Sequence, residues 1–228
     1  MGTLWGLLAA ALSWGLFALT FARYRRRPAL HNALYSLGLF LFALAVTAEL
    51  WARLAGAWDP VLYRLWYLAG AMHGVTFLGL GSLALLNPRA ARGLLLLLSP
   101  FILYGLYLVA SAPLDLTALP TPYAPSGKAF PEPSLTSPRL WTIPFNLLGT
   151  LLMAGVALYT TLLFWRQNPL RAQGTALIFG AALVLASTST LNRLGVVGLE
   201  ELGRAVGVAL LYLGVVLADR SVYAGGRA

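Results

Sequence analysis

Seven long apolar segments follow one another along almost the whole chain, and they limit what it can fold into. Each segment holds about 20 residues with few charges, which is the length an α-helix needs to cross a bilayer core of ~30 Å at ~1.5 Å per residue. They leave no room for a soluble domain. The chain is therefore predicted to be all-α: a polytopic membrane protein built as a single seven-transmembrane-helix bundle.

Charge and cysteine content narrow the class further. Only 10% of the residues are charged and 59% are hydrophobic, whereas soluble domains average about 25% charged. Cysteine is absent, which excludes disulfides, thiolate nucleophiles and cysteine-bound metal centres. The net charge of +9 is explained by an excess of arginines on one side of the membrane, described below. Membrane lipids are therefore expected partners, and nucleic acid is not.

The predicted helices are joined by short connections and one long one. They cover about 3–22, 30–52, 62–86, 93–112, 140–165, 174–193 and 203–219. The long connection, 113–139, contains seven of the thirteen prolines, so an extended, polyproline-like segment is expected there. It is either a lid over one face of the bundle or a loose connector, and the sequence leaves both open.

Basic residues gather on one side of the predicted bundle. That side carries one acid, Asp219, and ten arginines: Arg23, Arg25, Arg26, Arg27, Arg89, Arg92, Arg166, Arg171, Arg220 and Arg227. The other side carries six basic and six acidic residues. By the positive-inside rule the arginine side is cytoplasmic. With seven spans, the N-terminus then lies outside and the C-terminus in the cytoplasm, in the cell (cytoplasmic) membrane of a bacterium.

Polar residues recur on one face of the second predicted helix. At intervals of three to four residues this face carries His31, Tyr35, Gly38, Phe42, Ala45, Glu49 and Arg53. Glu49 and Arg53 are spaced i, i+4 and can pair, and Arg64 of the third helix lies at a depth that permits a bridge to Glu49. The stripe either lines a cavity that opens outward or includes an ion pair that only fixes the depth of the helix.

Other polar residues fall deeper in the predicted helices. His73 lies near the middle of the third helix, where it either bonds to a neighbouring helix or serves as a proton relay or ligand contact. The sixth helix contains consecutive hydroxyls from Ser187 to Thr190, followed by Asn192. These residues either line a polar pocket together with Asn146 or bond back to carbonyls of their own helix.

Several chemistries lack the residues that they need. A retinal Schiff base requires a lysine in the last helix, but the only lysine is Lys128 in the long connection. Two haem ligands would have to be His31 and His73, whose depths differ by ~15–18 Å at ~1.5 Å rise per residue. No metalloprotease, P-loop or paired-aspartate motif is found in the sequence. We therefore expect no cofactor and no metal, and no nucleophile or base indicates an enzyme.

The order of several features resembles the seven-transmembrane N-terminal sensor region of bacterial histidine kinases. The shared features are the basic run Arg23–Arg27, Glu49 near the outer surface, Tyr63-Arg64-Leu65-Trp66-Tyr67, Ser99-Pro100 and Arg166-Gln167. The resemblance implies a seven-helix bundle with a sensory role. The sequence departs from that pattern after the last helix, where about nine residues remain and no output domain is expected. Signalling would then pass through a partner.

The leading functional hypothesis is a receptor-like or sensor-like membrane protein that acts through a membrane protein partner. A small or lipidic ligand would enter from the extracytoplasmic side, between the second, third, fifth and sixth helices and under the long connection. The candidate ligand-binding residues are Glu49, Arg64, Trp66, Tyr67, His73, Tyr123, Asn146, Ser189 and Asn192. The alternatives are a structural or accessory subunit of a larger membrane complex, and a small lipid-handling transporter or intramembrane enzyme.

Overall fold

The computed structural model describes residues 2–122, 125–193 and 199–225, with side chains except for 188–193, 199–201 and 219–225. Its elements are α1 (Gly2–Arg26), α2 (Leu30–Ala55), α3 (Pro60–Trp66), the π-helix η1 (Tyr67–Gly74), α4 (Val75–Leu86), α5 (Pro88–Ser111), the short 3₁₀ helix η2 (Leu116–Ala118), α6 (Pro138–Phe164), α7 (Pro169–Arg193) and α8 (Leu199–Gly225). Over the described ranges these elements are all helical, which confirms the predicted all-α class.

Six helical segments are long and apolar enough to cross a membrane. They begin with α1 and α2, continue with the joined run of α3, η1 and α4, and end with α5, α6 and α7. In α8 the apolar stretch is shorter, Leu202–Ala218. The chain is thus a multi-pass helical membrane protein.

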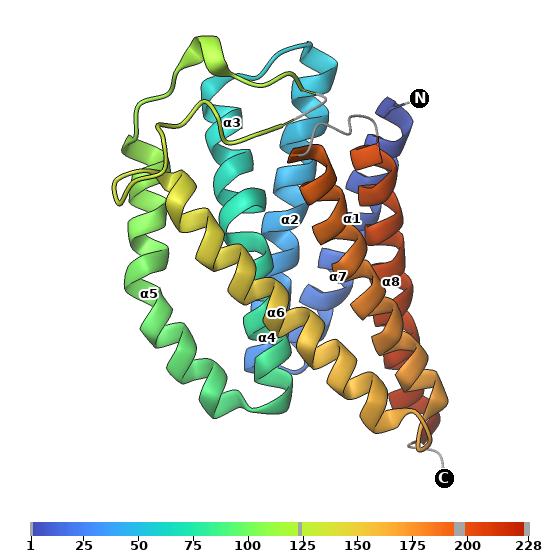
Figure 1. Cartoon of the computed structure of the whole chain (residues 1–228). Helices are drawn as coiled ribbons and strands as arrows, with labels where there is room; N and C mark the ends of the chain where they lie inside the picture. Colours follow the sequence, from blue (N-terminus) through green and yellow to red (C-terminus); the bar gives the residue numbers. More distant parts are fainter. Residues whose placement is uncertain (1, 123–124, 194–198, 226–228) are drawn as a thin grey trace.

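The helices run up and down between two ends of the bundle (Figure 1). The N-terminus and the long connection between α5 and α6 lie at one end, here called the loop end. At the opposite end lie the C-terminus and the connections from α1 to α2, from α4 to α5 and from α6 to α7, here called the arginine end. The basic connections predicted from the sequence therefore share one end of the bundle.

Four helices begin with the same two-residue signal. The pairs Asp59-Pro60, Asn87-Pro88, Ser137-Pro138 and Asn168-Pro169 start α3, α5, α6 and α7, and in each pair the first side chain accepts a hydrogen bond from a backbone amide of the first turn. Proline suits the next position because its missing N–H would be unpaired there anyway. These caps place the start of α5 at Pro88, earlier than the hydropathy estimate of about 93.

Glycines allow the closest helix crossings. A Cβ built on Gly79 of α4 would lie 2.5 Å from the carbonyl oxygen of Gly149 on α6, and one on Gly149 would lie 2.5 Å from the carbonyl of Val75. At the contact of α7 with α8, a Cβ on Gly214 would lie 2.7 Å from the Gly174 carbonyl. The backbones of two helices can approach this closely only where glycine, which has no side chain, lies at the crossing. Such glycine contacts are common between membrane helices.

The third span contains a wider helical turn than hydropathy could predict. It was expected as one helix over about 62–86, but η1 interrupts it from Tyr67 to Gly74. Asn146 of α6 donates from its side-chain amide to the Ala71 carbonyl inside this segment. One turn further on, the Thr76 hydroxyl lies 3.1 Å from the Phe145 carbonyl oxygen. The Asn146 side chain of α6 thus bonds to the segment and the Phe145 carbonyl to the residue Thr76 just after it, and π-turns of this kind are frequent at functional sites.

Candidate functional site at the loop end

The connection between α5 and α6 folds down onto the bundle. Ala129 and Phe130 are only 1% and 2% exposed, and the hydroxyl of Tyr63 donates to the Ser126 carbonyl at 2.6 Å. The Leu135 carbonyl accepts hydrogen bonds from the side chains of Tyr104 on α5 and Trp141 on α6. Of the two possibilities left by the sequence, the structure favours a packed lid.

The lid places its one phenylalanine in an aromatic site. The Phe130 ring lies 5.5 Å from that of Tyr63 and 4.7 Å from that of Tyr67, centroid to centroid. The Arg64 guanidinium carbon lies 5.8 Å from the Phe130 centroid. We call the surroundings formed by Tyr63, Arg64 and Tyr67 the Phe130 site. The space predicted to admit a ligand beneath the long connection is thus filled by the chain itself.

Two further contacts stabilise the lid near its beginning. The Asp115 amide donates to the Ala129 carbonyl at 2.9 Å, which joins the two limbs of the connection. The Asp115 carboxylate accepts from the hydroxyl and the amide of Thr117 at 2.6 and 2.9 Å. These bonds, first from the hydroxyl and then from the amide, hold the pKa of Asp115 below its usual value.

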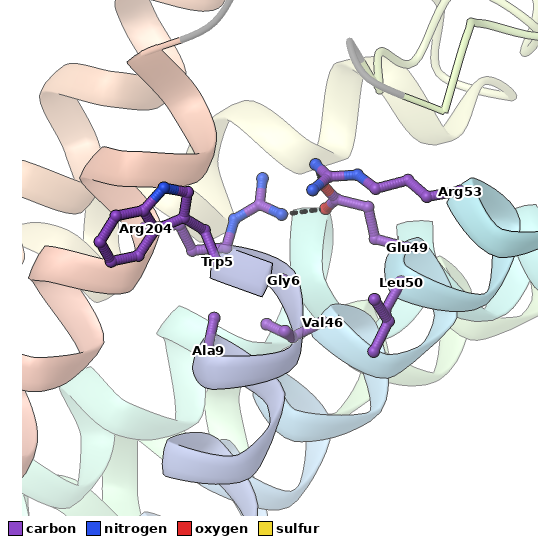
Figure 2. Close-up of a pocket in the computed structure, with 8 residues that line it drawn as sticks. All are labelled: Trp5, Gly6, Ala9, Val46, Glu49, Leu50, Arg53 and Arg204. Atoms are coloured by element: carbon purple, nitrogen blue, oxygen red, sulfur yellow. Dashed lines mark hydrogen bonds and ion pairs between the residues drawn. The ribbon is translucent and has the colours of Figure 1, made fainter. Parts of the chain in front are cut away.

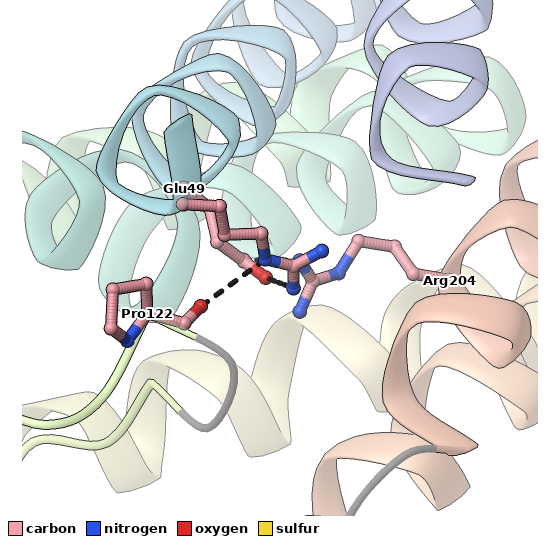
Figure 3. Close-up of polar contacts among 4 residues, drawn as sticks. Glu49, Pro122 and Arg204 are labelled. Carbon is pink, nitrogen blue, oxygen red and sulfur yellow. Dashed lines mark hydrogen bonds and ion pairs between the residues drawn. The ribbon is translucent and has the colours of Figure 1, made fainter. Parts of the chain in front are cut away.

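A buried group of charges lies beside the lid. The Glu49 carboxylate, 2% exposed, accepts from Arg53 one turn along α2 and from Arg204 of α8. Arg53 also donates from Nε to the Pro122 carbonyl of the lid at 3.2 Å (Figure 3). We call Glu49, Arg53 and Arg204 the polar triad. The predicted Glu49–Arg53 pair is confirmed, and the triad connects the lid to both α2 and α8.

A small hollow adjoins the polar triad between α1, α2 and α8. Besides the triad it is lined by Trp5, Gly6, Ala9, Val46 and Leu50 (Figure 2). Its accessible space is enough for at most about one water molecule. A Cβ on Gly6 would lie 3.2 Å from a methyl of Leu50, so α1 approaches α2 closely here. A ligand of any size would therefore need the surrounding side chains to move.

Arg64 does not take the role expected from the sequence. Its guanidinium donates to the carbonyls of Val109 and Ala112, and the bond to Ala112 is 2.8 Å long. These carbonyls lie at the C-terminal end of α5, where the helix dipole favours a cation. The predicted bridge from Arg64 to Glu49 is therefore wrong, because the end of α5 approaches Arg64 and α8 supplies the second arginine.

The polar stripe of α2, which the sequence left open as cavity lining, is packed against neighbouring helices. A Cβ on Gly38 would lie 2.9 Å from the Leu78 side chain of α4, and one on Gly70 of η1 would lie 2.6 Å from the Ala45 methyl. Tyr35 donates to the Ser82 hydroxyl of α4 at 3.0 Å. Below the polar triad this face of α2 is therefore a helix interface.

His73 lies apart from the other candidate residues. It is 5% exposed, and neither ring nitrogen has a hydrogen-bond partner among the residues that the structure describes. The ring lies 5.1 Å from that of Phe145, edge to face, and a Cβ on Gly105 of α5 would be 3.3 Å from its Cε1. The Ile102 carbonyl approaches the imidazole without reaching hydrogen-bond geometry. His73 therefore does not join α5 or α6 by a hydrogen bond.

The remaining candidates divide between separate places and undescribed positions. Trp66 and Tyr67 lie at the aromatic end of the third span, and Tyr67 accepts from the Thr142 hydroxyl of α6 at 2.9 Å. The Asn146 side-chain amide donates to the Ala71 carbonyl and so joins α6 to η1. Tyr123 and the side chains of Ser189 and Asn192 lie outside the described residues.

Sequence reasoning missed two residues that organise the site. Arg204 lies in an apolar helix on the same side as Glu49, so its charge was a signal that could have paired the two. Phe130 carried no such signal, because an apolar residue in a proline-rich connection has no periodicity to place it. Comparison with family models, with curated proteins and with solved structures finds no match.

Proposed function

We propose that this chain is a receptor-like or sensor-like membrane protein. It binds a small or lipidic ligand from the extracytoplasmic side and acts through a membrane protein partner. One observation carries the proposal: the polar triad joins the lid, where a ligand arrives, to α8, which extends to the opposite end of the bundle. The likeness to sensor regions of histidine kinases agrees with such a role.

The proposed topology makes α8 the seventh span. The arginine end would face the cytoplasm and the loop end the outside of a bacterial cytoplasmic membrane, by the positive-inside rule. The side chains of Arg25, Arg26, Arg27, Arg89 and Arg92 are exposed at the arginine end, where anionic headgroups would meet them. In this orientation the lid lies on the side from which a ligand would come.

Movement of the lid would reach α8 through two contacts. If the lid shifts, the Pro122 carbonyl leaves Arg53, and the guanidinium can change its position relative to Glu49. Glu49 is bonded from both sides, so a change at Arg53 alters its bond to Arg204. Two states of the triad would thus accompany two positions of the lid, which is what coupling between separate sites requires.

Native mass spectrometry of the protein, extracted in mild detergent from its own membrane, tests the proposal. We expect a discrete bound molecule on the wild-type chain and a larger bound fraction of a folded Glu49→Ala variant, because loss of the triad lets the lid open more easily. Glu132→Ala is the control, because Glu132 is 90% exposed and outside the triad. A bare chain would refute ligand binding. A second protein at fixed stoichiometry with no bound molecule would favour the accessory-subunit alternative.

A further inference from the structure

We infer that residues 126–130 occupy the ligand site of the protein and are displaced when ligand binds. This inference rests on the proposed function and names its ligand class. The ligand would carry an aromatic group that takes the place of the Phe130 ring, and a carbonyl oxygen that takes the place of the Ser126 carbonyl. An aromatic amide or a short peptide with an aromatic residue has this chemistry. We call residues 126–130 the plug segment.

The Phe130 site combines a hydrogen-bond donor with aromatic rings, and together these could recognise a ligand. Tyr63 is fully buried, and its hydroxyl bonds to a backbone carbonyl of the plug segment. That carbonyl has no feature particular to this chain, because any amide, ester or ketone presents the same acceptor. The hydroxyl therefore specifies an acceptor, and the rings around it specify a flat apolar group beside that acceptor.

The cation in the site favours an aromatic occupant over an aliphatic one. Arg64 remains in place by its bonds to the carbonyls that end α5, so its position does not depend on the plug segment. Its guanidinium lies 5.8 Å from the centroid of the Phe130 ring. A cation at this distance attracts the face of a ring and gives a saturated side chain no such advantage.

The plug segment can leave as a unit. Its Phe130 amide donates to its own Gly127 carbonyl at 3.1 Å, and this turn persists outside the site. Departure would break the Tyr63–Ser126 bond and the contact of the Asp115 amide with Ala129, and would uncover the Phe130 ring. Gly127 suits the tight fit, because a Cβ there would be 2.9 Å from the Tyr67 ring.

Cysteine labelling can follow the plug segment directly, because the chain has no cysteine of its own. Ala129→Cys places a thiol at a position that is 1% exposed, and Lys128→Cys places one at the exposed neighbouring position. In lipid nanodiscs, a membrane-impermeant maleimide should label position 128 quickly and position 129 slowly. N-acetylphenylalaninamide as probe should speed labelling at 129 several-fold, and N-acetylalaninamide should not.

A second pair of variants measures the site without the plug. Phe130→Ala should bind N-acetylphenylalaninamide about a hundredfold more tightly than wild type, because the probe no longer competes with the buried ring. Adding Tyr63→Phe should weaken that binding about fivefold, the value of one ordinary hydrogen bond. A Phe130→Ala protein that is helical and monodisperse but binds no probe would overturn the inference. Equal labelling at 128 and 129 without probe would overturn it too.

The two proposals fail separately. If native mass spectrometry finds a bound molecule whose bound fraction rises in Glu49→Ala, but the aromatic probe fails on Phe130→Ala, only the assignment of the Phe130 site falls. If the probe binds and opens the plug segment while the chain extracted from its own membrane carries no ligand, the receptor function falls and the site remains.

Discussion

Replacing Glu49 by alanine should destabilise the protein more than the loss of any other carboxylate that the structure describes. The side chains of Glu49 and Arg53 are 2% and 3% exposed, and that of Arg204 is 17% exposed. Removing the carboxylate leaves two guanidinium groups without the anion that they share. Breaking a buried ion pair in this way costs roughly 3–5 kcal/mol. We expect about 3 kcal/mol, because Arg204 retains access to water and Arg53 still bonds to Pro122.

The assay is reversible unfolding by sodium dodecyl sulfate in dodecylmaltoside micelles, followed by the fluorescence of the seven tryptophans. Glu132→Ala is the matched control, because its carboxylate is 90% exposed and lies 3.4 Å from Arg139. An exposed pair of this kind contributes about 0–1 kcal/mol. Equal losses for Glu49→Ala and Glu132→Ala would refute the description of the triad as a buried, shared ion pair.

Two more substitutions test the packing of the membrane interior. Gly149→Ala should destabilise the protein by about 1–3 kcal/mol in the same detergent titration, because the added Cβ would meet the Val75 carbonyl. Gly155→Ala is the control and should be neutral or stabilising, because a Cβ there meets nothing within 4 Å. His73→Leu should be neutral or stabilise by about 1 kcal/mol, because it removes two buried nitrogens without partners, and a clear loss of stability would show that the imidazole bonds to an essential group.

The helices could be predicted from the sequence because hydropathy reports the solvent around a segment. About 20 apolar residues in succession indicate a bilayer whatever the tertiary contacts are, so all the long helices were expected near their observed positions. Their ends were less accurate. Hydropathy does not register cap residues, and the start of α5 is set by Asn87 and Pro88, not by the first leucine run.

The contents of the site were less predictable because they depend on contacts between distant segments. The i, i+4 spacing was enough to pair Glu49 with Arg53, a local relation. Whether Arg64 or Arg204 would complete the pair depended on which helix lies beside α2 at the loop end. Sequence spacing alone does not show which helix lies beside α2. It does not show the position of Phe130 either, because that position depends on the path of the lid.

The π-helical segment is a third feature that only the structure reveals. Its residues, from Tyr67 to Gly74, carry no proline and would be compatible with an ordinary α-helix. The contact with α6, through Asn146 and the Phe145 carbonyl, supplies partners to this segment and to Thr76 just after it. The conformation of one helix is thus associated with its neighbour.

The connection that most needs testing is the one by which α8 controls the lid through Glu49. Arg204→Met removes the α8 cation and leaves the Glu49–Arg53 pair in place, and it can be combined with the single cysteine at Ala129→Cys. We expect faster maleimide labelling of position 129 in the Arg204→Met background, and unchanged labelling in a Glu132→Ala background. Equal rates in folded Arg204→Met and Arg204 proteins would contradict the connection between the lid and α8.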